Sequence, residues 1–497
     1  MAACIAVFCG RPAWAADVPL TQRPWYVVNT AHFNIYSCGE LGKVYKLAAR
    51  LEQFSSAYAQ LAGAQAVQSP PIVVLAFPDH TAMTPYLPLY EGHPISMAAF
   101  FQHGHDENLI VLSLPERDLA DMGLDVIFHE YAHLLFRRND QIWPLWLKEG
   151  MAEIYSTFQT SGGSAQIANP IGHHLRALAR EAWLPLPELF AVNHDSATYN
   201  EQNRQGIFYA ESWLLTHYLI CGDNAQHVAA LGRYTELLQQ GQLPVQAFTN
   251  AVQMPLPILE AELRRYLARG VFRPLELSLK AQLTAPVSAN THPIAPAELL
   301  VRLGDELLRI QRFDAAEARF DEAKKLAPGS PFPEEGLGLL AHERKNHGAA
   351  LRHLKAAMAL DSRSFLAYYL YAQETYAETA SGNRYRRLDG PVAGELRQVL
   401  GKSIALMPDF APAHELLGFF EMVQGDNLTL AGEHLVRAIQ LEPENRSYLL
   451  ALAQLQLHAH KPEAARQTLQ PLLLPNVDAD VRAEAQTILS EIGKRYP

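Results

Sequence analysis

A 34-residue repeat in the C-terminal part of the chain limits its fold more than any other feature. The first two units place a Leu-Gly pair at the same distance before small or apolar residues. The first unit has Leu303-Gly304, Ala316, Phe320 and Ala323, and the second has Leu337-Gly338, Ala350, Leu354 and Ala357. Small residues at such positions let the two helices of a unit pack closely. Stacked units form a superhelix with a concave face, so residues 297–497 are predicted to be all-α.

The repeat continues towards the end of the chain. Two later units end at residues 406–408 (Leu-Met-Pro) and 441–443 (Leu-Glu-Pro), and a fifth runs over 447–473. The third unit carries an insertion near 377–390, and the second helix of the fourth is shifted by one residue. This register resembles the tetratricopeptide repeat (TPR). The resemblance implies that the concave face binds a protein partner.

A second motif lies upstream, inside an apolar run. It is H-E-x-x-H, with His129, Glu130 and His133. Residues four apart share one face of a helix, so the two histidines can bind one metal ion. Glu130 stands beside the first ligand, where it can take a proton from metal-bound water. A tetrahedral catalytic zinc normally has three protein ligands and one open position, so the motif predicts a zinc site that needs one more ligand.

The segment W-L-K-E-G-M-A-E at 146–153 can supply the third ligand. Its carboxylates Glu149 and Glu153 are also four apart on one helical face. One of them can bind zinc while the other orients a ligating histidine. The spacing alone does not assign the two roles.

The two motifs together resemble the gluzincin metallopeptidases of the peptidase-MA-like superfamily, over about residues 25–270. The resemblance implies an α+β thermolysin-like domain with one Zn²⁺ per chain, held by His129, His133 and Glu149. It makes Glu130 the catalytic base and Glu153 the carboxylate that supports a zinc ligand. The superfamily pattern often has Asp at that last position, where this chain has Glu153.

Other zinc-peptidase classes fit less well. A metzincin would have Gly and His where Phe136 and Asn139 stand, and the G-x-M-E-N motif of the related aminopeptidases is missing from the sequence. An endopeptidase acting on a peptide or protein substrate is therefore the expected activity.

The resemblance also implies two groups around the metal. The strand before the first zinc helix is often an edge strand that pairs with extended substrate; here it covers Asn108, Leu109, Ile110 and Val111. A tyrosine or histidine downstream often stabilises the tetrahedral intermediate, with Tyr209 the first candidate and Tyr199 the second. Ordinary sheet filling and core packing are the alternatives for these residues.

Four further histidines are interpreted as exposed residues rather than ligands: His103, His105, His173 and His174. The rest of the catalytic region divides into an α/β subdomain at 17–115 and a mainly helical subdomain at 116–275. In the first, strands are predicted at 25–36, 72–77 and 108–113, and a helix at 43–61. The Pro-, Ala- and Ser-rich stretch within 276–296 predicts a linker.

The N-terminus and the charge bear on location and partners. Residues 1–16 have a short apolar run and Ala13-Trp14-Ala15, the pattern of a secretory signal. A secreted or periplasmic protein is therefore expected. Beyond that segment Cys38 and Cys221 remain, either as one disulfide or as two separate thiols. The net charge of -11 and the missing basic run argue against nucleic acid as a partner. No apolar run in the sequence reaches the ~18 residues of a transmembrane span.

Two functions follow from these motifs. The first is a zinc-dependent peptidase that acts on a protein recruited by the repeats. The second is a catalytically silent TPR adaptor of the cell envelope that keeps a metallopeptidase-like domain. Glu130 favours the first, because binding zinc requires only the ligands.

Overall fold

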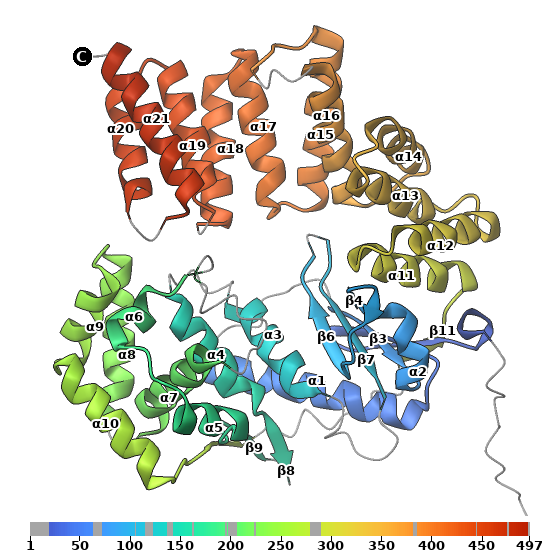
Figure 1. Ribbon diagram of the computed structural model, residues 1–497. Helices are drawn as coiled ribbons and strands as arrows, with labels where there is room; N and C mark the ends of the chain where they lie inside the picture. The colour runs from blue at the N-terminus through green and yellow to red at the C-terminus, as the bar shows by residue number, and fades with distance from the viewer. Residues whose placement is uncertain are drawn as a thin grey trace, which may run out of the picture.

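The computed structural model shows a mixed α/β body beneath an arc of paired helices (Figure 1). It describes residues 19–62, 72–104, 106–114, 123–136, 143–161, 164–193, 196, 206–222, 225–278, 290–380, 385–443, 445–474 and 477–495. The secretory segment predicted at 1–16 lies outside these residues.

A six-stranded sheet forms the first part of the body, in the order β11-β1-β2-β3-β7-β6. Strands β2, β3 and β7 are parallel, and the other three are antiparallel to their neighbours. The strand predicted over 25–36 is in fact two, because the chain reverses between Asn29 and Phe33. The bounds are β1 Tyr26–Asn29, β2 Phe33–Ser37, β3 Ile72–Phe77, β6 Ala99–Gln102, β7 Leu109–Ser113 and β11 Thr291–Pro293.

Helices cover both faces of this sheet. On one face, helix α1 (Leu41–Ala62) buries Val44, Leu47, Leu51 and Phe54 in the same core as helix α3. The helical spacing of those residues predicted α1 to within two residues. Three short elements lie between β3 and β6 in the chain: α2 His80–Met83, β4 Leu89–Tyr90 and β5 His93–Pro94.

The second part of the body is mainly helical, as expected, but it also contains a small antiparallel sheet of β8, β9 and β10. The helices are α3 Leu124–Phe136, α4 Leu145–Ser156, α5 Gly172–Arg180, α6 Leu186–Ala191, α7 Ile207–Cys221, α8 Ala225–Gln239, α9 Pro244–Val252 and α10 Leu256–Arg269. The strands are β8 Gln159–Ser161, β9 Ser164–Ile167 and β10 Leu275–Ser278.

The C-terminal part is an all-α array of TPR pairs, with a closing helix α21. Close packing at the predicted glycines holds each pair together: a Cβ on Gly338 would lie 2.7 Å from Leu354, and one on Gly418 2.8 Å from Leu435. The pairs are α11 Pro296–Arg309 with α12 Phe313–Leu326, α13 Phe332–Glu343 with α14 His347–Ala359, α15 Phe365–Ala380 with α16 Gly390–Leu406, α17 Ala411–Gln424 with α18 Leu428–Leu441, and α19 Ser447–His458 with α20 Pro462–Leu469; α21 is Ala479–Arg495.

Both described ends of the stretch predicted as a linker at 276–296 lie in strands, which corrects the prediction for residues 276–278 and 291–293; residues 279–289 lie outside the described residues. Strand β10 uses the start of that stretch, and β11 pairs with β1 so that Thr291 lies opposite Val28. Helix α11 then packs on the second face of the sheet, in one core with Trp25, Val27 and Leu75. Composition favoured a linker because Pro, Ala and Ser are frequent in this stretch, and composition carries no signal for the three residues of β11.

The remaining global predictions concern cysteines and membranes. Cys38 and Cys221 are free thiols, each partly buried, so the two-thiol alternative holds. Burial raises the pKa of Cys38 to about 11 and that of Cys221 to about 12. None of the helices in the described ranges is long and apolar enough to cross a membrane.

Candidate metal centre

Helices α3 and α4 bring three metal-binding side chains to one point. His129 Nε2 lies 3.1 Å from His133 Nε2, and both nitrogens lie 3.3 Å from Glu149 Oε2. Across the described residues this is the group of three whose donor atoms lie close enough to hold one metal ion. His129 and Glu149 are buried, and His133 is partly exposed. The two motifs therefore meet as their helical spacing predicts.

The separation of these donors fits zinc. A tetrahedral zinc with nitrogen and oxygen ligands ~2.0–2.1 Å away holds its ligands about 3.3 Å apart. The three donor–donor distances of 3.1, 3.3 and 3.3 Å are close to that value. Three protein ligands would leave one coordination position open, which is the arrangement of catalytic rather than structural zinc sites.

A glycine beside Glu149 allows helix α4 to approach helix α7. A Cβ on Gly150 would lie 2.1 Å from Thr216 Oγ1 and 2.4 Å from the backbone oxygen of Ser212. Such distances are too short for any side chain, and the backbone atom cannot move aside. The Glu-Gly pair thus joins a metal donor to the residue that lets its helix pack on the core.

Glu153 supports the donors from behind. Its Oε1 lies 3.3 Å from His129 Nδ1, which leaves Nε2 of that ring facing the other donors. Its Oε2 lies 3.3 Å from Nε2 of His174, a side chain with no exposed surface. The interpretation of His174 as an exposed residue was therefore wrong, because α5 turns it inward beneath α7. His173 is half-buried.

The carboxylates of this cluster remain ionised. Burial alone would raise the pKa of Glu149, but hydrogen bonds from His129 and His133 lower it to about 2. Glu153 is shifted downward too, because hydrogen bonds from His129 and His174 outweigh burial in setting its pKa. Burial would lower the pKa of His129, yet its two carboxylate partners raise it to about 9. Two buried anions facing imidazoles form a site whose charge suits a divalent cation.

Glu130 follows His129 in helix α3 and has a partner that the sequence did not suggest. Its Oε2 is 3.7 Å from Nε2 of His103, and the Glu130 side chain is 12% exposed. His103 was predicted to be a solvated loop residue, but it faces the H-E-x-x-H helix and is only 32% exposed. His105, its neighbour in the sequence, lies outside the described residues. The signal for His103 is its place directly after a strand that the sequence reading missed.

The predicted substrate edge strand is wrong by one strand. Residues Leu109, Ile110 and Val111 belong to β7, which lies inside the sheet between β3 and β6, and Asn108 precedes that strand. Among the described strands the edge is β6, Ala99–Gln102, which pairs with β7 and with no other of them. The run 109–112 is fully apolar because both of its faces and both of its sides are buried. The short β6 has no such run and was missed.

The candidates for stabilising the intermediate are less defined. Tyr209 lies in the first turn of α7, and its side chain is buried at 7% exposure. Tyr199 lies outside the described residues. Buried packing and a role near the metal are both compatible with the position of Tyr209.

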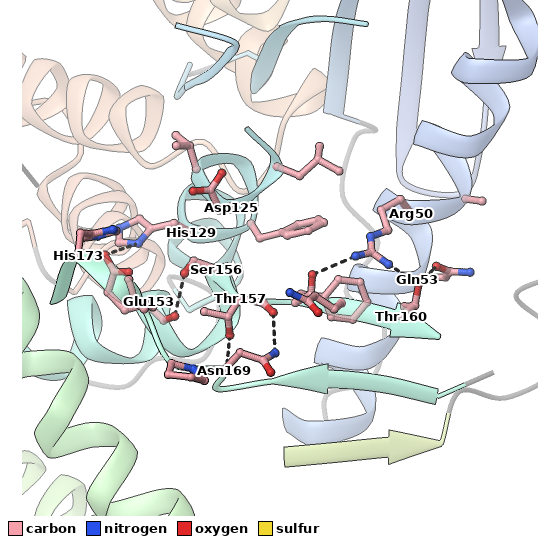
Figure 2. Close-up of a pocket in the computed structure, with 18 of the residues that line it drawn as sticks. Arg50, Gln53, Asp125, His129, Glu153, Ser156, Thr157, Thr160, Asn169 and His173 are labelled. Carbon is pink, nitrogen blue, oxygen red and sulfur yellow. Dashed lines mark hydrogen bonds and ion pairs between the residues drawn. The ribbon is translucent and has the colours of Figure 1, made fainter. Parts of the chain in front are cut away.

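A cavity of about 1030 Å³ adjoins the centre (Figure 2). It reaches His129 and Glu153 from the side where α3 faces α1, and neither Glu130 nor His133 lines it. Arg50 borders it and donates hydrogen bonds to the hydroxyl of Thr160 and the backbone oxygen of Phe158. The cavity thus lies behind the donors and not on the face that carries the proposed base.

No protein-family model matches this chain, and no curated protein matches it. Solved structures of TPR proteins do. A thermophilic TPR protein of Thermus thermophilus, TTC0263, is 24% identical, with 39% of this chain and 99% of that one covered and a TM-score of 0.30. YrrB, described as a TPR protein with an unusual peptide-binding site, is 12% identical over 40% and 92%, with a TM-score of 0.32. Pseudomonas aeruginosa pilF is 19% identical over 40% and 92%, with a TM-score of 0.31. Scores of this size carry no argument, so the TPR assignment stands on the helix pairs and their register.

Proposed function

We propose that this protein is a zinc-dependent peptide-bond hydrolase of thermolysin-like, gluzincin type whose TPR array recruits a protein substrate. The observation that supports it is the convergence of His129, His133 and Glu149 on one point, with Glu130 directly after the first of these donors in helix α3. A structural zinc site needs a fourth ligand and no neighbouring base. An endopeptidase fits best, since the chain has no G-x-M-E-N motif for a free amine.

His129, His133 and Glu149 would hold the zinc ion. When bound, zinc supplies polarisation of the scissile carbonyl and a lowered pKa for the attacking water. Glu130 accepts a proton from the attacking water while the oxygen of that water bonds to the carbonyl carbon. It then passes the proton to the leaving nitrogen as the carbon–nitrogen bond breaks. Glu153 keeps His129 oriented, and Tyr209 is the candidate donor to the intermediate.

The corrected edge strand suggests how an extended substrate would lie. Strand β6 has one free side, and a peptide added there forms main-chain hydrogen bonds independent of sequence. It would then run past the Glu130 face of α3, onto which β6 leads. Its side chains, alternating in direction, would give the specificity.

Zinc content and peptide hydrolysis test the proposal together. The wild type should bind about one zinc per chain and cleave an unstructured peptide library. Glu130→Gln should keep the metal and lose hydrolysis, whereas His129→Ala should lose both. Glu181→Gln, at the exposed end of α5, is the matched control. If Glu130→Gln emptied the site, the assignment of base and ligand would be wrong.

A silent adaptor is the second candidate, favoured by the size of the array and its concave face. It predicts that the wild type and Glu130→Gln bind the same partner and that neither cleaves it. A periplasmic or secreted location is proposed from residues 1–16 alone, and processing after Ala15 or Ala16 in the purified protein would test it.

A further inference from the structure

The first helix of the array, α11, forms ion pairs with the loop that joins β6 to β7. Nη1 of Arg302 in α11 donates to both carboxylate oxygens of Glu107, at 2.7 and 2.9 Å. Two turns further on, Arg309 donates to Asp106 at 2.9 Å. A Cβ on Gly104 would lie 2.2 Å from Arg309 Nη1 and 2.3 Å from the backbone oxygen of Glu107, so only glycine fits. Two basic residues of α11 therefore fix three described residues of the loop.

These contacts are more sheltered than ordinary surface ion pairs. The side chains of Arg302 and Glu107 are 26% and 19% exposed, and the guanidinium lies over the ring of Tyr36 at 5.4 Å. Burial would lower the pKa of Arg302, but the charge of Glu107 holds it above its usual value. Removing one partner of such a pair leaves the other charge poorly compensated. Replacing either Arg302 or Glu107 should therefore break the contact between α11 and the loop.

The same loop, between β6 and β7, also places His103 at the candidate active site. His103 follows β6 directly, and its Nε2 lies 3.7 Å from Glu130 Oε2. The imidazole packs against Phe101 of β6, with ring centroids 4.9 Å apart. A 3.7 Å approach is ion-pair range, and such contacts often shorten when substrate closes a site. The position of His103 therefore depends on β6, which precedes it, and on the loop residues that α11 holds, which follow it.

We propose that α11 of the TPR array completes the active site by holding His103 against Glu130. His103 acts as a positioning residue: its N–H keeps the Glu130 carboxylate aimed at the attacking water. A carboxylate free to swing spends less time in the productive orientation, which lowers kcat. A partner that shifts α11 would accordingly change turnover without touching the metal. This inference rests on the proposed peptidase function.

A double-mutant cycle in the full-length protein tests the contact between α11 and the loop. Arg302→Ala, Glu107→Ala and the double variant are compared with Arg344→Ala, which breaks a pair with Asp314 and Glu317 elsewhere in the array. The readouts are zinc content, kcat and KM on a peptide, and hydrogen exchange across β6–β7. Each single variant should lower kcat about 10-fold, keep zinc and speed exchange. The double variant should be no worse than either single one, because the two residues act through each other.

His103 itself supplies the second arm. His103→Ala should lower kcat to the same extent, with KM and zinc unchanged. His103→Gln, which keeps an N–H donor, should recover part of the loss. Kinetics of Arg302→Ala equal to those of Arg344→Ala, or faster exchange with unchanged kcat, would overturn the inference and leave the peptidase proposal intact. A wild type no more active than Glu130→Gln would overturn both.

Discussion

The first helical pair and the outer pairs of the array share one sequence repeat but have different neighbours. In the first pair Leu299, Leu303 and Leu307 are buried against the sheet, in a core that includes Trp25. The outer pairs bury their apolar residues only against each other and α21. A repeat array needs something to cover its ends. Here the sheet covers one end, so the first pair belongs structurally to the α/β body.

Truncation is the largest test of this difference. A chain ending at residue 275 loses β11, α11 and all of β10 but its first residue, and it exposes the sheet face. Each buried leucine contributes ~1.5–3 kcal/mol, and a domain has only ~5–15 kcal/mol in total. It should be insoluble or bind no zinc, whereas a chain ending at residue 361 should stay folded with zinc. Size-exclusion chromatography with metal analysis distinguishes them. A well-folded, zinc-loaded chain of residues 17–275 would show that the two parts are independent.

Single leucines probe the same contrast with a smaller effect. Leu303 and Leu435 are both fully buried and both belong to the repeat. Their replacement by Ala should each cost ~2–5 kcal/mol. Leu303→Ala should lower the melting temperature of the zinc-binding unit. Leu435→Ala should melt only the outer pairs and leave zinc binding unchanged. Calorimetry and metal content measured on the two variants together check this, and equal effects on zinc would contradict it.

The glycines at helix crossings sharpen the comparison further. A Cβ on Gly150 meets backbone of Ser212, whereas one on Gly338 meets the flexible side chain of Leu354. Gly150→Ala should therefore cost roughly 3 kcal/mol and weaken zinc binding, because α4 must move away from α7. Gly338→Ala should cost roughly 1 kcal/mol and leave the metal in place. Urea unfolding with zinc titration would reveal any reversal of this order.

A buried acid in each region gives a predicted effect that depends on pH. In α7, burial raises the pKa of Glu211 to about 8, although a hydrogen bond from the backbone of Leu184 opposes the shift. The folded pKa exceeds the unfolded value of ~4.3, so stability is lost as pH rises from that value towards 8. The free energy of unfolding of Glu211→Gln should therefore exceed that of the wild type by roughly 2 kcal/mol at pH 7 and equal it at pH 4.

The matched acid lies in α17 of the array. Glu421 is buried but accepts two bonds from Arg397, at 2.6 and 3.0 Å. Glu421→Gln should therefore destabilise the protein at pH 7 rather than stabilise it. Thermal melts of both variants at the two pH values make the comparison, and a stabilising Glu421→Gln would contradict it.

Local periodicity explains how much the sequence predicted. Helices α3 and α4 and most of the helix pairs follow from local spacings of three, four and 34 residues. The grouping of His129, His133 and Glu149 was implied by the family resemblance of the two motifs, and the structure brings their donor atoms together. The partners of these residues were missed. His103 and His174 reach Glu130 and Glu153 from other strands and helices of the chain. Such contacts depend on how elements stack, and no short-range pattern encodes that. The sheet edge was misplaced for the same reason.

The pairing of β1 with β11 has a consequence for how the protein forms. Tyr26 lies opposite Pro293, so helices α3 and α4 lie in an insertion between the strands of one sheet. During synthesis the N-terminal strands emerge long before their last partner. Closing so long a loop is slow, and the open edge can pair with other chains meanwhile. Nascent chains that stop short of β11 should therefore depend on chaperones, and release from that dependence should coincide with the emergence of α11.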